Sequence, residues 1–267
     1  MTATEHLTTG WEPDLDATDS MLRRYLHAWV GQCDAFVTSL GGEVMVTDAW
    51  ALADARRPTG LFNAATLLSP LPFDDADAVL DDVEAAIEGG TGEVHLWSAW
   101  PTPDLRARGW ELVGHPPLLV RPPASVLAPP ARPDVDLRPV ADPEDLVEWE
   151  RVVVDGFPLP EVRPSGAVAG AGLIEDDRLR LTLGYEGGRP VSAGALFTHD
   201  GLGLFALAAT EPAARGRGHW RAHAADRLEA APDVWMAGAF ADLSRPLAEA
   251  IGFVPLLRFT LWSRPRP

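Results

Sequence analysis

The sequence contains no lysine and only one cysteine, and each shortage excludes a class of structure. Cys33 by itself can form neither an intrachain disulfide nor a cysteine-rich zinc site, which fits a reducing compartment. No stretch approaches the roughly 18 uninterrupted apolar residues of a membrane span. Residues 1–16 lack the basic segment and apolar core of a secretory leader. We therefore expect a cytoplasmic protein that has no membrane partner.

The missing lysine leaves arginine as the only strong cation. The 22 arginines face 39 acidic residues, for a formal charge of −17. Such a surface repels nucleic acids and favours cationic or amine-bearing partners, although acidity that serves only solubility is the simpler interpretation. The 267 residues are enough for one large domain or two modest ones, and they leave a homodimer open.

A proline-rich segment, RPPASVLAPPARPD, occupies residues 121–134. Proline lacks a backbone donor and fixes φ, so neither a helix nor a central strand can run through this segment. We place the domain boundary here, with one domain over 1–125 and a second over 126–267.

The second half is predicted to be an ordered series of strands and helices. A strand is expected over 134–140, followed by an amphipathic helix over 142–157 that has proline in its first turn. Alternation over 178–210, interrupted by the turn signals EGGRP and HDG, predicts a three-stranded meander. The remaining elements are helix 220–231, strand 233–240, short helix 244–253 and a final strand 254–263.

The first half repeats those last four elements. Its helix, strand, short helix and strand are expected over 75–90, 93–100, 102–110 and 111–122. The pair Gly109-Trp110 corresponds to Gly252-Phe253 at the end of each short helix. Chance similarity between α/β units is the alternative to an internal repeat. Only the second copy has an arginine- and glycine-rich turn before its first helix.

That turn, EPAARGRGHW (211–220), has the composition of an anion-binding loop. Glycine lets phosphate oxygens approach main-chain N–H groups, and the positive end of a helix dipole favours negative charge. Arg215 and Arg217 can add charge-assisted hydrogen bonds to a diphosphate. An exposed arginine turn that only caps the helix is an equal alternative.

The same residues resemble the signature of the GCN5-related N-acetyltransferases (GNAT family). That signature is Arg or Gln, two residues, Gly, one residue, then Gly or Ala, between the fourth strand and the third helix. LFALAATEP resembles the family's fourth strand, and SRPLAEAIGF resembles a later helix. The resemblance covers about 135–262, and the first half is similar, more weakly, to partial N-terminal lobes of two-lobed bacterial members. In this chain the signature reads Arg215, Gly216, Arg217, Gly218, His219, Trp220.

The resemblance implies a mixed α/β (α+β) protein with the GNAT-like acyl-CoA N-acyltransferase fold, a mixed central sheet flanked by helices. Residues 126–267 would form the acetyltransferase domain, and 1–125 a partial, degenerate lobe without a CoA loop. Acetyl-CoA would be the co-substrate, with its pyrophosphate at 215–220 and its pantetheine along Leu207, Ala208 and Ala209. The reaction implied is N-acetyl transfer to a small-molecule amine.

Two departures from the family pattern put activity in doubt. Trp220 stands at the Gly or Ala position, where close approach of the cofactor normally demands almost no side chain. Ala248 stands where the family usually has the tyrosine that protonates the leaving thiolate. Losing a general acid costs about 10²- to 10⁴-fold in rate, yet proximity alone can drive aminolysis of a thioester. The alternative function is therefore a degenerate relative that binds CoA or another ligand, or acts as an interaction module, without acetyl transfer.

The sequence identifies no catalytic base. Asp200 at a strand turn and Glu161 in a loop are candidates, and each is also an ordinary turn residue. His219 and His223 with Asp226 have the spacing of metal ligands, but a polar helix face explains them, and we expect no metal. The ten tryptophans, among them Trp97, fill cores or line an aromatic acceptor pocket between the lobes.

Overall fold

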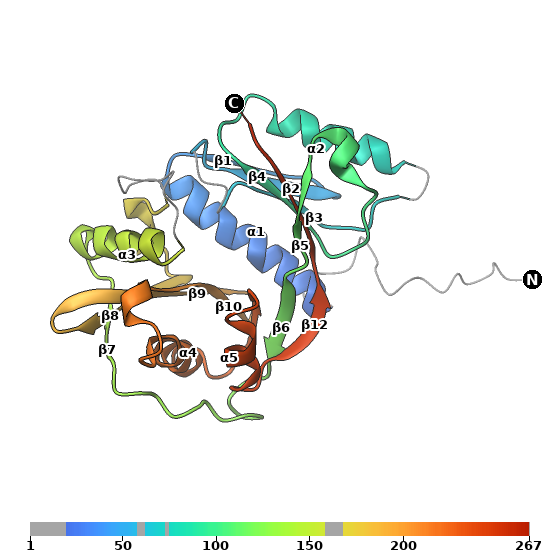
Figure 1. Ribbon diagram of the computed structural model, residues 1–267. Helices are drawn as coiled ribbons and strands as arrows, with labels where there is room; N and C mark the ends of the chain where they lie inside the picture. Colours follow the sequence, from blue (N-terminus) through green and yellow to red (C-terminus); the bar gives the residue numbers. More distant parts are fainter. Residues whose placement is uncertain (1–19, 58–61, 73–74, 158–167, 267) are drawn as a thin grey trace, which may run out of the picture.

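The computed structural model describes residues 20–57, 62–72, 75–157 and 168–266. It contains two mixed sheets flanked by helices, as the sequence predicted (Figure 1). One sheet has six strands in the order β1-β2-β3-β4-β13-β5, and the other has seven in the order β12-β6-β11-β10-β9-β8-β7.

The seven-stranded sheet confirms the helix and strand order predicted for the second half. Asp142 caps α3 by accepting a hydrogen bond from the N–H of Asp145, with proline in the first turn as expected. The elements are β7 (Asp136–Pro139), α3 (Pro143–Gly156), β8 (Leu179–Glu186), β9 (Arg189–His199), β10 (Leu202–Thr210), α4 (His219–Ala230), β11 (Trp235–Ala239), α5 (Arg245–Glu249) and β12 (Val254–Arg258).

The lobe built on the six-stranded sheet contains the repeated elements of the first half. They are preceded by a helix and three strands that the sequence analysis did not predict. These earlier elements are α1 (Met21–Ser39), β1 (Glu43–Val46), β2 (Trp50–Asp54) and β3 (Ala64–Leu67). The predicted ones are α2 (Ala76–Ile87), β4 (Val94–Ser98), the 3₁₀ helix η1 (Leu105–Arg108) and β5 (Glu111–Gly114).

The prediction of one strand over 111–122 and one over 254–263 is wrong. Each of these segments forms two strands, and the two strands belong to different sheets. The chain leaves β5 to form β6 (Pro117–Arg121) between β11 and β12, and it leaves β12 to form β13 (Thr260–Arg264) between β4 and β5. The two crossing points are hydrogen-bonded, with the N–H of Phe259 donating to the carbonyl of Pro116 at 3.0 Å. The two sheets therefore exchange strands, and their membership crosses the boundary proposed at 125.

The internal repeat is visible at the corners of both copies. Gly109 and Gly252 have φ of 81° and 93°, which favours glycine. The following Trp110 donates its N–H to the carbonyl of Leu105, and Phe253 does the same to Ala248. Both rings are buried, at 1% and 2% exposure. A tight helix end that directs an aromatic ring into the core is thus used twice.

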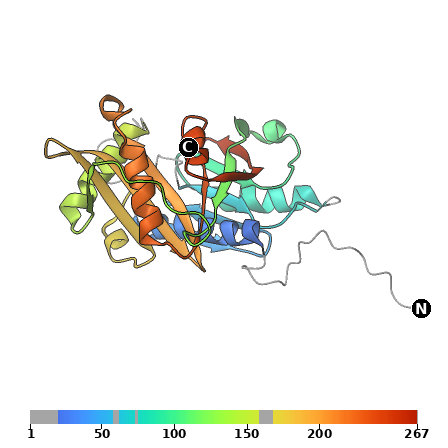
Figure 2. The ribbon, with the colours of Figure 1, turned by 90° about the horizontal axis from the view of Figure 1, so that it is seen from below.

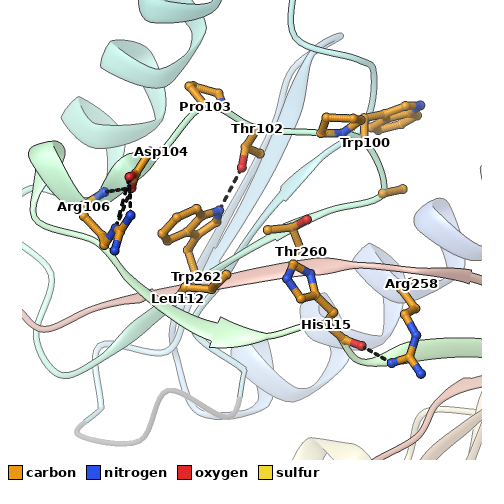
Figure 3. Close-up of a pocket in the computed structure, with 12 residues that line it drawn as sticks. Trp100, Thr102, Pro103, Asp104, Arg106, Leu112, His115, Arg258, Thr260 and Trp262 are labelled. Atoms are coloured by element: carbon orange, nitrogen blue, oxygen red, sulfur yellow. Dashed lines mark hydrogen bonds and ion pairs between the residues drawn. The ribbon is translucent and has the colours of Figure 1, made fainter.

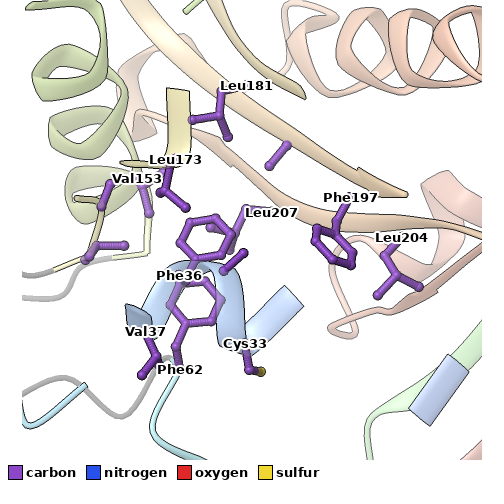
Figure 4. Packing of buried hydrophobic residues seen from close by; sticks show 14 of the residues in the cluster. Cys33, Phe36, Val37, Phe62, Val153, Leu173, Leu181, Phe197, Leu204 and Leu207 are labelled. Carbon is purple, nitrogen blue, oxygen red and sulfur yellow. The ribbon is translucent and has the colours of Figure 1, made fainter. Parts of the chain in front are cut away.

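Helix α1 lies between the two sheets and joins their cores. It packs against β9 and β10 on one side and against β1, β2 and β3 on the other. Figure 4 shows Phe36 of this helix close to Phe62 and to Leu207 of β10. Helices α4 and α5 cover the opposite face of the seven-stranded sheet, and the view in Figure 2 shows α4 crossing the strands. None of the helices within the described residues has the length and apolar character needed to span a membrane.

Candidate acyl-transfer site

The candidate site begins where β10 and β11 separate. These parallel strands pair only over three residues, Leu202 to Leu204 with Trp235 to Ala237. Beyond a bulge between Phe205 and Leu207, β10 continues to Thr210 paired with β9 alone. The segment proposed to bind pantetheine, 207–209, thus has no β11 partner along one edge, and extended main-chain groups there can pair with a ligand.

A cavity of about 290 Å³ occupies the gap between these strands. The lobe of the seven-stranded sheet contributes Phe205, Leu207 and Ala208 of β10 together with Trp220 and Phe240, while the other lobe contributes a largely aromatic wall. Trp97 of β4 is one of the residues in that wall, so an aromatic pocket between the lobes is present. The members of the wall are Tyr25, Trp29, Gln32, Phe62 and Trp97.

The loop before α4 has the backbone geometry of an anion-binding turn. Gly216 and Gly218 have φ of 79° and 89°, and the start of α4 has no side-chain cap. The first N–H groups of a helix have no intrahelical acceptor. Since Gly218 offers no capping oxygen, these donors remain available to a ligand at the positive end of the helix dipole.

The two loop arginines are held by the protein itself. Arg215 donates to the carbonyls of Thr210 and Gly156 at 3.2 and 2.9 Å. Arg217 contacts Glu186 at 2.5 Å and donates to the carbonyl of Ala213 at 2.9 Å. Both side chains therefore fix the shape of the loop, and a phosphate would have to share or displace these hydrogen bonds.

The His219 side chain points into the sheet rather than toward the loop. Its Nδ1 lies 2.8 Å from Ser192 Oγ and its Nε2 lies 2.9 Å from Glu186. His223 joins the same buried network through Ser192 and Thr182, both at 2.9 Å. Burial, and then the charge of Arg227, hold the pKa of His223 well below its ordinary 6.5. Only the backbone of His219 can serve a bound phosphate.

Metal binding finds no support in this geometry. Asp226 pairs with Arg180 at 3.2 Å and lies 3.5 Å from Arg132, away from the two histidines that precede it on the helix. Within the described residues there is no cluster of three metal-ligating side chains.

Trp220 lines the cavity and packs, half-buried, against the apolar cluster that contains Phe205 and Phe240. Its indole therefore takes part of the space that a glycine or alanine would leave. Ala248 is fully buried in the same cluster, and its methyl side chain has no hydroxyl that could act at the site.

Of the two candidates for a catalytic base, the structure describes only Asp200. Asp200 lies in the turn at the beginning of β10, where its carboxylate is 3.2 Å from His199, and it does not line the cavity. Glu161 lies outside the described residues. Within the described part of the chain, no Asp, Glu or His lines this cavity.

Sequence reasoning missed two polar residues that do line the cavity, Gln32 and Arg227. They are 1% and 2% exposed, and Gln32 Nε2 and Arg227 Nη2 have no hydrogen-bond partner among the described residues. A signal for Arg227 existed, because it follows His219 and His223 at four-residue steps on one helix face, and that face is the buried one. Nothing in the sequence pattern marked Gln32.

A second, larger cavity of about 730 Å³ lies in the other lobe, between the end of β4 and the strands β5 and β13 (Figure 3). Several of its polar side chains are already paired with one another. Trp262 donates to Thr102 at 2.9 Å, and Arg106 is paired with Asp104 at 2.6 Å. It also lacks a glycine-rich turn, so the smaller cavity is the better candidate site.

Several solved structures that share this architecture are GNAT proteins. A GCN5-related N-acetyltransferase from Kribbella flavida is similar over 89% of this chain and 96% of its own, with a TM-score of 0.61 at 18% identity. A GCN5-related N-acetyltransferase-like protein from Streptococcus suis covers 90% and 100%, with a TM-score of 0.52 at 16% identity.

A tandem GNAT protein from the clavulanic acid biosynthesis pathway covers 93% and 96%, with a TM-score of 0.51 at 13% identity. No protein-family model and no curated protein matches the sequence. The chain thus has the two-lobed fold of the GNAT acetyltransferases, which confirms the resemblance at the level of the fold.

Proposed function

We propose that this chain, with its GNAT fold, transfers the acetyl group of acetyl-CoA to a small amine bound in the 290 Å³ cavity. The main support for this function is the place of the cavity, which lies where β10 and β11 separate and is closed by the other lobe. A cofactor held at the start of α4 and along 207–209 would place its thioester against an acceptor in the aromatic wall. Proximity is then the main source of acceleration.

The lining indicates the class of amine. Tyr25, Trp29 and Trp97 favour an acceptor with an apolar or aromatic body. No carboxylate or imidazole of the described residues stands ready to take a proton from an ammonium. An amine that is already neutral near pH 7 is therefore the better substrate, and Gln32 can orient it by donating a hydrogen bond to an acceptor atom of the substrate other than the attacking nitrogen.

Calorimetric titration with acetyl-CoA, followed by a thiol-release assay over amines of different basicity, tests the proposal. We expect binding, and thiol release that is fastest for weakly basic aromatic or apolar amines. Binding without thiol release would instead support the degenerate alternative, which Trp220 and Ala248 favour. Absence of binding would remove both CoA-based functions.

A pair of glycine variants tests the cofactor loop with matched backbone cost. Gly216 and Gly188 have φ of 79° and 81°, and neither has another atom within 4 Å of an added Cβ. Both alanine variants therefore carry the same strain, but Gly188 lies in the turn between β8 and β9. We expect Gly216→Ala to weaken CoA binding on the order of tenfold or more, by about 1.4 kcal/mol, and Gly188→Ala to leave it unchanged. Equal effects would contradict a phosphate site in the loop.

A further inference from the structure

Arg227 is a buried cation that no carboxylate among the described residues neutralises. It lies on α4 beneath β10, 2% exposed, with its guanidinium 3.9 Å from the ring centroid of Phe205. Its neighbour Asp226 is engaged by Arg180, and among the described residues no acidic group forms an ion pair with Arg227. Burial lowers the pKa of Arg227 to about 9, so the group is still cationic at pH 7.

The hydrogen bonds of Arg227 place the charge at the bulge of β10. Nε donates to the carbonyl of His223, and Nη1 donates to the carbonyls of Ala195 and Leu207 at 3.4 and 3.3 Å. Nη2 has no partner, although the residue lines the cavity. The only other titratable side chain described in the lining is Tyr25, and burial raises its pKa, so it stays neutral. A cation held in this way attracts an anion that forms in the cavity.

Resting on the proposed function, we infer that Arg227 stabilises the CoA thiolate as it leaves, and so takes the place of the missing general acid at Ala248. Both residues lie on the α4 and α5 side of the sheet, and both border the apolar cluster around Phe205. Arg227 is still protonated at pH 7, so its positive charge balances the negative charge that a tyrosine would quench by proton transfer.

The step balances without another reactant. The lone pair of a neutral amine attacks the thioester carbonyl carbon, the C–N bond forms, and the C–S bond breaks with its electron pair moving to sulfur. The nitrogen then loses one proton to water and the thiolate gains one, so that the products are an N-acetyl amine and CoA thiol. Arg227 faces the sulfur while it carries the negative charge.

The pKa of the CoA thiol in the complex tests this role separately from turnover. The thiol of free CoA, titrated in the same way, is the reference. We expect ultraviolet titration of the wild-type complex to give a thiol pKa at least about one unit below that of the Arg227→Gln complex, and Arg227→Lys to retain most of the difference. Glutamine Nε2 lies where the arginine Nε lies and can still donate to the carbonyl of His223, so a purely structural role predicts no difference in the thiol pKa.

Thiol release provides the second readout. Arg227→Gln should slow it by about 10²-fold or more, with little change in affinity for a CoA analogue that lacks the sulfur. If Arg227→Gln does not fold, a thiol pKa in the wild-type complex at or above that of free CoA overturns the inference. Equal thiol pKa values in the wild type and Arg227→Gln overturn it as well. Failure of CoA to bind at all instead overturns the proposed function.

Discussion

At the scale of single residues, the site combines side chains that the fold has left in costly states. Among the described residues, Gln32 has a buried amide nitrogen without a partner, Arg227 is a buried cation, and Trp220 forms part of the cavity wall. A buried polar group without a partner costs about 1–3 kcal/mol, and a buried charge costs several. Such costs are expected where a ligand later supplies the missing partner.

Replacing Gln32 should therefore stabilise the free protein while harming function. We expect Gln32→Leu to raise the free energy of unfolding by about 1 kcal/mol, because the unpaired amide is removed, and to raise KM for the amine. Urea unfolding and steady-state kinetics measure the two effects. Ser39→Ala is the control and should lower the free energy of unfolding, since Ser39 Oγ accepts a hydrogen bond from the N–H of Gly170 at 3.1 Å. A less stable Gln32→Leu protein would show that this amide is satisfied in solution.

Removing the indole at position 220 should tighten cofactor binding. The cavity, at about 290 Å³, is at the small end for ligand sites because Trp220 forms part of its wall. We expect Trp220→Gly or Trp220→Ala to lower the Kd for CoA by on the order of tenfold, measured by calorimetry. Trp220→Phe keeps most of the ring and should change the Kd little. Unchanged or weaker binding in the small-residue variants would contradict obstruction and make the indole a cofactor contact.

At the scale of elements, α4 buries polar side chains together with apolar ones such as Ala224 and Leu228. The side that faces the sheet carries His219, His223 and Arg227, all buried. Ser192 and Thr182 on the sheet pair with the two imidazoles, so the polar face is largely satisfied within the fold. The unpaired Nη2 of Arg227 marks where this packing reaches the cavity.

This polar face predicts a specific loss of stability in acid. His223 is held neutral in the folded protein, whereas the unfolded chain takes up a proton below about pH 6.5. The unfolded state then binds more protons, so the free energy of unfolding falls as pH drops below 6.5, by up to about 1.4 kcal/mol per pH unit for this residue. Urea unfolding at several pH values should show a shallower dependence for His223→Gln.

A matched control separates titration of His223 from general disturbance of the network. Thr182→Val removes one partner of the imidazole but leaves it buried and titratable. The Thr182→Val protein should be less stable at every pH yet keep the acid dependence of the wild type. If His223→Gln retains the full dependence, another group is responsible.

At the scale of the whole molecule, the exchanged strands make the two lobes depend on each other. β6 is an interior strand of the seven-stranded sheet, although it precedes the boundary proposed at 125. β13 is an interior strand of the six-stranded sheet. Helix α1 also contributes to the core shared by both sheets. Calorimetry should therefore show one cooperative unfolding transition for the full chain rather than two.

Fragments offer a direct test of this dependence. The piece 126–267 lacks β6, so β11 and β12 would lose their shared neighbour, and we expect it to aggregate or remain unfolded. The piece 115–259 contains every strand of the seven-stranded sheet and should retain more structure by circular dichroism, although it lacks α1. Equal folding of the two pieces would show that β6 is dispensable.

The sequence by itself determined those helices and turns that were predicted, and the glycine-rich loop at 215–220. Helix spacing, the EGGRP and HDG turns and the two glycine-aromatic corners depend on contacts a few residues apart, and they appear in the structure where they were predicted. The shape of the loop at 215–220 likewise depends on the backbone preferences of its own glycines.

The tertiary structure alone decided which strands pair and which residues meet at the cavity. The residues of 111–122 and 254–263 favour extended structure whether the chain stays in one sheet or crosses to the other, because a local preference for strand carries no information about the neighbouring strand. Gln32 and Arg227 are 195 positions apart, and only the packing of α1 and α4 around β10 brings both to one cavity. Local preferences fix helices and strands, whereas partners distant in sequence are selected by the burial of a common core.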